Sequence, residues 1–156
     1  MSPRPAYKAF EWITSGRSPW QVSYEAHVDY LGWLGTVYDG ATGGTGGQDK
    51  NLQALWVRLN SQYPGVSICY EVWVVGPGSS VACDGAQAGT TGQGLPVESF
   101  RVWLENAPPG LNVCYTPNFS GTGWESNAAV CNGLWQGGGG TRLQAVSIRL
   151  LDERGV

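Results

Sequence analysis

The sequence predicts an all-β domain, and three observations support this fold class. Glycine accounts for 24 of the 156 residues, against roughly 11 expected from average usage, and glycine disfavours helices. Eight Trp and seven Tyr accompany many Val, and aromatic and β-branched residues fit the pleated surface of a sheet. Similar segments also recur with a period of about 45 residues. Because 156 residues correspond to one domain, we expect a single all-β domain with many glycine turns and little or no helix.

Three copies of the repeat are predicted, at residues 22–59, 66–104 and 111–150. Each copy begins near a Tyr, carries an Asx-Gly pair near its middle and ends near a Leu. The residues concerned are Tyr24, Tyr70 and Tyr115, then Asp39-Gly40, Asp84-Gly85 and Asn132-Gly133, and finally Leu59, Leu104 and Leu150. Residues 7–14 resemble the end of a repeat, and we expect them to form an extra strand that closes the first unit.

Each copy is expected to contain a strand, a turn, a second strand, the Asx-Gly turn, a glycine-rich loop and a final strand. In copy two, Ile68, Tyr70 and Val72 alternate as strand residues do, and residues 75–78 have the turn sequence Val-Gly-Pro-Gly. Units this small must share a core, which we expect around a pseudo-threefold axis. A long final strand after a glycine-rich loop favours a β-prism-like arrangement. A β-trefoil is the alternative, although the Gln-x-Trp typical of trefoil repeats is missing near the repeat ends.

The four cysteines fall on either side of predicted hairpin turns. Cys69 and Cys83 are equidistant from Gly76, and Cys114 and Cys131 flank a second glycine-containing turn. Residues equidistant from a hairpin turn face each other across the strands, at a separation that suits a disulfide. The sequence therefore predicts the disulfides Cys69–Cys83 and Cys114–Cys131.

Copy one has Ser23 and Tyr38 at the positions of the cysteines, so its hairpin is expected to hold by packing alone. Two disulfides indicate an oxidising compartment, because cytosolic thiols are kept reduced. Four free cysteines or a zinc site are the alternative, which the absence of a C-x-x-C spacing and the presence of a single His disfavour. The first five residues lack the apolar core of a signal peptide, so we expect a secreted or cell-surface protein whose mature region follows an added Met.

Composition and motifs exclude several classes of function. Only 13% of the residues are charged and the net charge is −3, so we expect no nucleic-acid partner, and no apolar stretch approaches the ~20 residues of a membrane span. The only histidine is His27, and no nucleophile motif accompanies it, so an enzyme is not expected. Residues 43–50 end in Lys but lack the second Gly of a phosphate loop. The acidic residues are dispersed, so we expect no metal and no cofactor.

Copies one and two carry the strings that identify a family resemblance. Copy one has Tyr-Glu-Ala-His-Val at residues 24–28, then Gly32-Trp33 and Asp39-Gly40, whereas copy two has Ala-Gly-Thr-Thr-Gly at residues 88–92. These strings resemble the clostridial hydrophobic repeat with a Trp, the ChW repeat, and the resemblance covers residues 22–150. It implies a bacterial secreted or cell-surface protein, with suspected roles in polysaccharide binding or adhesion and no catalytic residues to transfer.

The copies depart from this pattern in different ways, so three equivalent sites are not expected. Copy two lacks the Gly-Trp pair and has Trp73 where copy one has His27. Copy three has Asn118 at that position and replaces the Thr-containing loop by four glycines at residues 137–140.

The candidate ligand-binding residues are aromatic or polar residues at turns and in glycine-rich loops. Sugars stack their apolar faces on aromatic rings and hydrogen-bond their hydroxyls to short polar groups and loop amides. The candidates are His27, Trp33, Asp39, Thr45, Asp84, Thr90, Trp124 and Asn132. Each has a structural alternative: core packing for a Trp, turn formation for an Asx-Gly pair, and a satisfied buried group for the His. Glu98 is expected to bond the amides of the adjacent loop.

The sequence thus predicts a noncatalytic, lectin-like module that binds a glycan or cell-wall polysaccharide. Copy one is expected to be the strongest site, because His27, Trp33, Asp39 and Thr45 all occur in it. The alternative from a different class is a structural or adhesive surface domain that binds protein partners through exposed aromatic residues. A protease inhibitor on a trefoil is a third interpretation, disfavoured because no loop is long and disulfide-braced.

Overall fold

The computed structural model describes residues 20–61, 64–125 and 130–152, which contain strands, turns and loops but no helix. Six long strands carry the fold, and seven shorter ones flank them. The long strands are β1 (Trp20–Val28), β5 (Leu52–Ser61), β6 (Ser67–Val74), β9 (Val97–Glu105), β10 (Asn112–Phe119) and β13 (Leu143–Leu151). The shorter strands are β2 (Gly32–Trp33), β3 (Val37–Tyr38), β4 (Gly43–Gly44), β7 (Gly78–Cys83), β8 (Ala88–Gly89), β11 (Gly123–Trp124) and β12 (Val130–Cys131).

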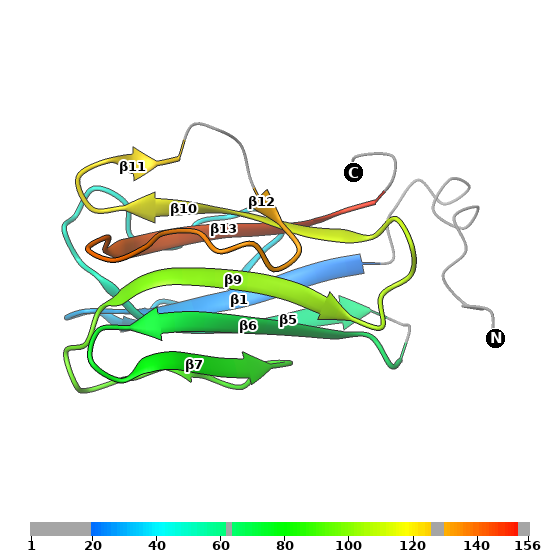
Figure 1. Ribbon diagram of the computed structural model, residues 1–156, viewed down its shortest axis with the longest axis horizontal. Coiled ribbons are helices and arrows are strands. Elements are labelled where there is room, and N and C mark those ends of the chain that lie inside the picture. Colours follow the sequence, from blue (N-terminus) through cyan, green and yellow to red (C-terminus); the bar gives the residue numbers. More distant parts are fainter. Residues whose placement is uncertain (1–19, 62–63, 126–129, 153–156) are drawn as a thin grey trace.

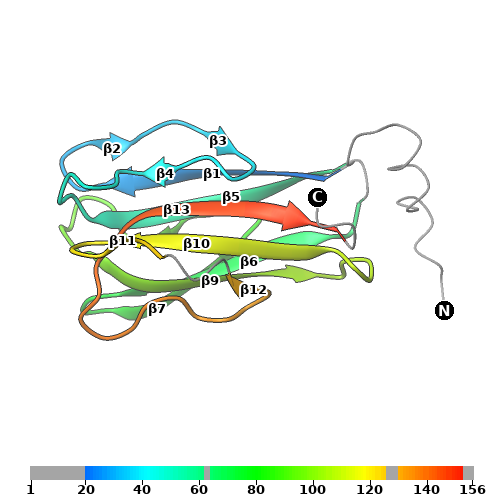
Figure 2. The ribbon, with the colours of Figure 1, turned by 90° about the horizontal axis from the view of Figure 1, so that it is seen from above.

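The strands form three antiparallel sheets, each built around one pair of long strands (Figures 1 and 2). The central pairs are β1–β5, β6–β9 and β10–β13. We call β1–β5 the first unit, β6–β9 the second and β10–β13 the third. Each unit follows the predicted order of elements: a long strand, a hairpin, an Asx-Gly turn, a glycine-rich loop and a second long strand. The expected all-β class is therefore confirmed.

A single core lies between the three sheets. Apolar residues of all six long strands enter it, and Tyr24, Tyr70 and Tyr115 are among its largest fully buried side chains. Each sheet packs its inner face on this core, because a sheet of one unit alone has no second layer to cover its apolar residues. At one end of the strands, Trp20 and Leu111 pack on residues near the strand termini and close the core.

The three units also exchange their glycine-rich loops. Strand β4 of the first unit pairs with β13 of the third, where Gly44 faces Ala145. Strand β8 of the second unit pairs with β5 of the first, and residue 136 of the third unit forms a bridge with Phe100 on β9 of the second. Every unit therefore contributes a loop to one neighbour and accepts a loop from the other, and the exchange closes into a ring.

Both predicted disulfides are present. They join Cys69 to Cys83 and Cys114 to Cys131, with a Cα–Cα separation of 4.0 Å in each. In the first unit, Ser23 faces Tyr38 at the same place in the hairpin, as the sequence predicted. The disulfides are consistent with an extracellular environment.

Two further expectations concern the strand at residues 7–14 and the absence of a membrane span. The closing strand expected at residues 7–14 lies outside the described residues. In the part of the chain that the structure describes, no helix is long and apolar enough to cross a membrane.

Candidate ligand-binding sites

Each exchanged loop meets the sheet of its neighbour at what we call a junction. The first junction combines β1 and β2 of the first unit with the loop after β8 of the second. His27 faces Trp33 in the register of β1 and β2, and their rings meet edge to face with centroids 5.3 Å apart. The amide of Thr90 donates to the carbonyl oxygen of Gln53 at 3.1 Å, which fixes the loop on β5. Trp33 remains 38% exposed.

Local backbone geometry creates this first junction. The register of β1 and β5 shifts between His27 and Val28, which leaves Gln53 as the extra residue of a β-bulge. The side-chain amide of Gln53 donates to Asp29 at 3.2 Å. Gly89 has a φ of +91°, and a Cβ atom there would lie 2.4 Å from the carbonyl oxygen of Gln53. Only glycine therefore lets the loop approach β5 closely enough for the Thr90 amide to bond.

Two buried polar atoms of the first junction have no hydrogen-bond partner among the described residues. They are Nδ1 of His27 and the hydroxyl oxygen of Thr90. A buried polar group without a partner costs about 1–3 kcal/mol, so native proteins normally satisfy such groups with protein, water or ligand. The His27 ring contacts the exposed Trp33, whereas Thr90 lies on the loop held by Gln53 of β5.

The second junction repeats this arrangement with different residues. Asn118 on β10 faces Trp124 on β11, as His27 faces Trp33, and the register shifts at the next residue in both units. The amide of Thr45, from the loop of the first unit, donates to the carbonyl oxygen of Gln144 at 3.0 Å. A Cβ atom on Gly46 would lie 2.8 Å from Nδ2 of Asn118, so this loop rests directly on the Asn side chain.

Three buried polar atoms are unpartnered at the second junction, again counting only the described residues. They are the hydroxyl oxygen of Thr45, Oδ1 of Asn118 and Nε2 of Gln144. Trp124, which faces Asn118, is 41% exposed. The two junctions thus share a pattern: one exposed Trp, one buried Thr hydroxyl without a partner, and further buried nitrogen or oxygen atoms with free hydrogen-bonding capacity.

The third junction satisfies its own polar groups. Trp73 faces Ser79, and Gly138 occupies the position of Thr45 and Thr90. The carboxylate of Glu98 accepts a bond from the amide of Gly140 at 2.9 Å and pairs with Arg142 at 3.3 Å. Glu98 therefore bonds a loop amide, as expected, but the loop is that of the third unit and not of its own. The hydroxyl of Thr141 donates to the Glu98 carbonyl oxygen at 2.6 Å.

The Asx residues of the three central turns bond the backbone of their own units. Asp39, Asp84 and Asn132 all have a left-handed φ, of 43°, 52° and 56°. Their Oδ1 atoms accept bonds from the amides of Val22, Ile68 and Val113 at 2.9, 3.0 and 3.0 Å. Val22 lies five residues before His27 on β1, a distance of about 17 Å along an extended strand. Asp39 therefore sits far from the first junction.

The structure divides the candidate residues differently from the grouping by copy. The first junction contains His27 and Trp33 of the first unit together with Thr90 of the second. The second junction contains Trp124 of the third unit together with Thr45 of the first. Copy one thus contributes to two junctions and completes neither alone. Gln53 and Gln144 were not identified as site residues from the sequence, because their place in the junctions depends on contacts between units.

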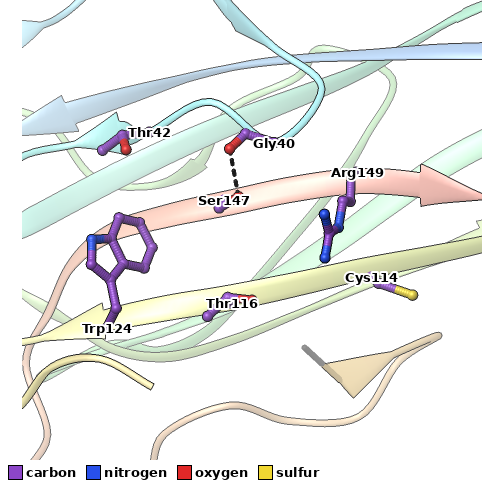
Figure 3. Close-up of a pocket in the computed structure, with 7 residues that line it drawn as sticks. All are labelled: Gly40, Thr42, Cys114, Thr116, Trp124, Ser147 and Arg149. Carbon is purple, nitrogen blue, oxygen red and sulfur yellow. Dashed lines mark hydrogen bonds between the residues drawn. The ribbon is translucent and has the colours of Figure 1, made fainter. Parts of the chain in front are cut away.

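An open groove of about 310 Å³ extends from the second junction along the third sheet (Figure 3). Trp124 lies at one end and Arg149 at the other, with Ser147 between them. The hydroxyl of Ser147 donates to the carbonyl oxygen of Gly40 at 2.8 Å. The groove is lined by Gly40 and Thr42 of the first unit and by Cys114, Thr116, Trp124, Ser147 and Arg149 of the third.

The groove exists because two facing positions of the third sheet carry small side chains. Thr116 faces Ser147 in the register of β10 and β13. The corresponding pair of the first sheet is Glu25 and Trp56, in which the indole nitrogen donates to the carboxylate at 3.0 Å. Larger side chains therefore occupy this position in the first sheet.

The second sheet fills the same position with an ion pair. Glu71 faces Arg101, with 2.7 Å between a carboxylate oxygen and a guanidinium nitrogen. Burial alone would raise the pKa of Glu71, but hydrogen bonds from Ser79 and Arg101 together with the Arg101 charge lower it below its usual value. The Arg101 guanidinium also lies 4.9 Å from the centroid of Trp103 and 5.1 Å from that of Trp135.

The fold and these junctions define a class: an all-β protein whose units exchange glycine-rich loops and expose a Trp beside buried polar groups. A family model described as Clostridial hydrophobic W, ChW, matches residues 27–61 and 76–106. ChW repeats are therefore detected in the first and second units. The matched ranges include His27, Trp33, Thr45 and Thr90, whereas the third unit lies outside them. Comparison with curated proteins and with solved structures found no match.

Proposed function

We propose that the protein is a noncatalytic carbohydrate-binding module, secreted or displayed at the cell surface, that holds glycans at its first and second junctions. The observation that carries this proposal is the set of five buried polar atoms without partners in the described residues, which belong to the two junctions that contain the exposed Trp33 and Trp124. An exposed indole face stacks on the apolar face of a sugar ring, and the nearby nitrogen and oxygen atoms bond its hydroxyls.

The proposed architecture is a β-prism with a pseudo-threefold axis, as the sequence predicts. Three sheets around one core support it, and so does the closed ring of loop exchange. In such a prism the junctions are related by rotation. The two that keep an unpartnered Thr hydroxyl are the proposed binding sites, and the third junction, held by Glu98, serves as a structural contact.

The two Thr hydroxyls provide a test that separates binding from stability. Thr90→Val and Thr45→Val remove a hydroxyl that has no partner in the described residues, so the folded domain should keep or gain stability. Glycan affinity should fall by about 0.5–1.5 kcal/mol for each lost hydrogen bond, or roughly threefold to tenfold. Titration calorimetry with glycans selected on an array measures this loss, and unfolding in urea measures the stability.

Thr141→Val is the matched control, because the Thr141 hydroxyl bonds Glu98 and Gly138 within the third junction. This variant should lose stability and keep its glycan affinity. Folded Thr90→Val and Thr45→Val proteins that bind glycans as the parent does would contradict the proposal, and so would a parent that binds no glycan.

The second candidate function is a structural or adhesive surface domain that binds protein partners. Exposed aromatic residues favour it, since Tyr30 is 90% exposed and Trp73 and Trp135 are 46% and 41% exposed. In this case Trp73→Ala, at the third junction, should weaken partner binding without any effect of added sugars on Trp fluorescence.

A further inference from the structure

We infer that the groove of the third unit binds an acidic oligosaccharide, with a carboxylate at Arg149 and a neutral ring on Trp124. The inference rests on the proposed carbohydrate-binding function and adds the charge of the ligand. Its starting point is the difference between the three sheets. Glu25 with Trp56 and Glu71 with Arg101 fill the corresponding positions of the first and second sheets, whereas a groove opens where the third sheet has Thr116 and Ser147.

The charge at one end of the groove has no internal partner in the structure. Arg149 faces Cys114 across the strands and is exposed, and no described carboxylate lies within ion-pairing distance of its guanidinium. The other arginines of these sheets are engaged. Arg101 and Arg142 form ion pairs, and Arg58 stacks over Trp56 at 5.6 Å. An arginine fork matches a carboxylate through two parallel hydrogen bonds, so a carboxylate is the ligand group that fits Arg149 best.

The rest of the groove suits a sugar and gives the ligand a direction. The hydroxyl groups of Thr42, Thr116 and Ser147 line the groove between Arg149 and the exposed ring of Trp124 (Figure 3). Arg149 faces Cys114, and Trp124 faces Asn118, which lies four positions further along β10. The two ends of the groove are therefore about 13 Å apart along the strand. This length exceeds one sugar ring. The occupant is therefore an oligosaccharide.

The polarity of the groove places the acidic unit at the Arg149 end. Glu125 follows Trp124 directly and is exposed, so the Trp end carries a negative charge. A ligand carboxylate would be repelled there and attracted at Arg149, whereas a neutral ring stacks on the indole without a charge penalty.

The test uses the full chain and three trisaccharide probes in which one terminal unit is galacturonic, glucuronic or mannuronic acid and the other two units are neutral hexoses, each with its carboxyl-reduced neutral form. At least one acidic probe should bind more tightly than its reduced form. Arg149→Gln should lower the affinity for that probe by roughly tenfold to a hundredfold, as expected for a lost bond between charged groups, and abolish the preference over the reduced form. Arg58→Gln is the matched control, because Arg58 occupies the corresponding position of the first sheet, and it should change neither value.

A second variant tests the groove itself. Thr116→Glu combined with Ser147→Trp copies the pair that fills the first sheet and should block the acidic probes, while neutral glycans still bind at the first junction. Circular dichroism shows whether the double variant folds. If the double variant does not fold, the result for Arg149→Gln alone decides whether the groove binds the acidic probes. The inference is overturned if no acidic probe outbinds its reduced form, or if Arg149→Gln binds all three as the parent does. If neutral glycans still bind and Thr90→Val still weakens their binding, the proposed carbohydrate-binding function remains supported.

Discussion

At the scale of single residues, three tyrosines connect the core to the loops. Tyr24, Tyr70 and Tyr115 are fully buried, and their hydroxyls donate to the carbonyl oxygens of Ala41, Ala86 and Leu134, each two residues after an Asx residue. The Tyr24 hydroxyl also accepts a bond from the amide of Ile148 at 3.0 Å, which joins the first unit to the third. The tyrosines therefore hold the central turns and, through Tyr24, a contact between units.

Removing the Tyr24 hydroxyl should destabilise the protein. Tyr24→Phe leaves the buried amide of Ile148 without a partner, and a buried donor left unsatisfied costs about 1–3 kcal/mol. Urea unfolding measures this loss. Tyr38→Phe is the control, because Tyr38 is 49% exposed, and it should unfold like the parent. Equal stabilities of the two variants would contradict the structural role of Tyr24.

The same burial predicts a loss of stability in alkali. Burial raises the pKa of Tyr24, Tyr70 and Tyr115 above the ordinary value of 10.0. A raised pKa in the folded state favours the protonated form, so this stabilisation is complete below pH 10 and is lost as the pH rises through the folded pKa. Melting temperatures followed from neutral pH to above pH 10 should fall, and less steeply for Tyr24→Phe. Parallel curves for parent and variant would show that Tyr24 does not contribute.

Two substitutions at Asp39 distinguish its hydrogen bond to the Val22 amide from its predicted role in ligand binding. Asp39→Ala removes the acceptor of the Val22 amide and should cost about 1–3 kcal/mol, whereas Asp39→Asn should keep the bond, because Asn132 makes it naturally in the third unit. Thermal unfolding distinguishes the two variants. If folded Asp39→Asn loses glycan affinity at the first junction, the ligand role holds despite its distance from His27.

At the scale of elements, the glycines before Thr45 and Thr90 decide whether a loop can approach the sheet of the neighbouring unit. Gly89→Ala places a Cβ atom 2.4 Å from the Gln53 carbonyl oxygen, at a φ of +91°. This substitution should lower the free energy of unfolding by clearly more than the roughly 1–2 kcal/mol that an alanine with a left-handed backbone conformation costs. It should also weaken glycan binding at the first junction. Gly92→Ala is the matched control, since its φ is also positive but nothing lies within 4 Å of its Cβ position. Similar losses for both variants would contradict the close approach of the loop.

The elements also show what the sequence could and could not predict. Hairpins carry their register in local turns, so Cys69–Cys83, Cys114–Cys131 and even the facing of Ser23 and Tyr38 could be predicted. Loop exchange depends on two-residue strands such as β4, which have no pattern of their own and do not indicate which neighbour they join. The groove was missed for a related reason. Thr116 and Ser147 matter only through the larger side chains at corresponding positions of the other sheets.

At the scale of the whole molecule, the ring of exchanged loops predicts cooperative folding. The third unit supplies the strand that accepts the loop of the first and the bridge that covers β9 of the second. The full chain should unfold in one transition, with Trp fluorescence and far-UV circular dichroism coincident, whereas a chain ending at residue 106 should show no cooperative transition. A cooperative transition in the shortened chain would show that the first two units fold without the third.

The direction of the long strands has a consequence for how the protein meets its target. Strands β1, β6 and β10 all begin at the end closed by Trp20 and Leu111 and run toward the end that carries Trp33 and Trp124 (Figure 2). The described chain enters at β1 and leaves at β13 at the first of these ends. Both the entry and the exit of the described chain therefore lie at the end opposite Trp33 and Trp124. Under the proposed function, both junctions can contact one polysaccharide at once, and two weak contacts act as a single strong one because the second forms at a high effective concentration.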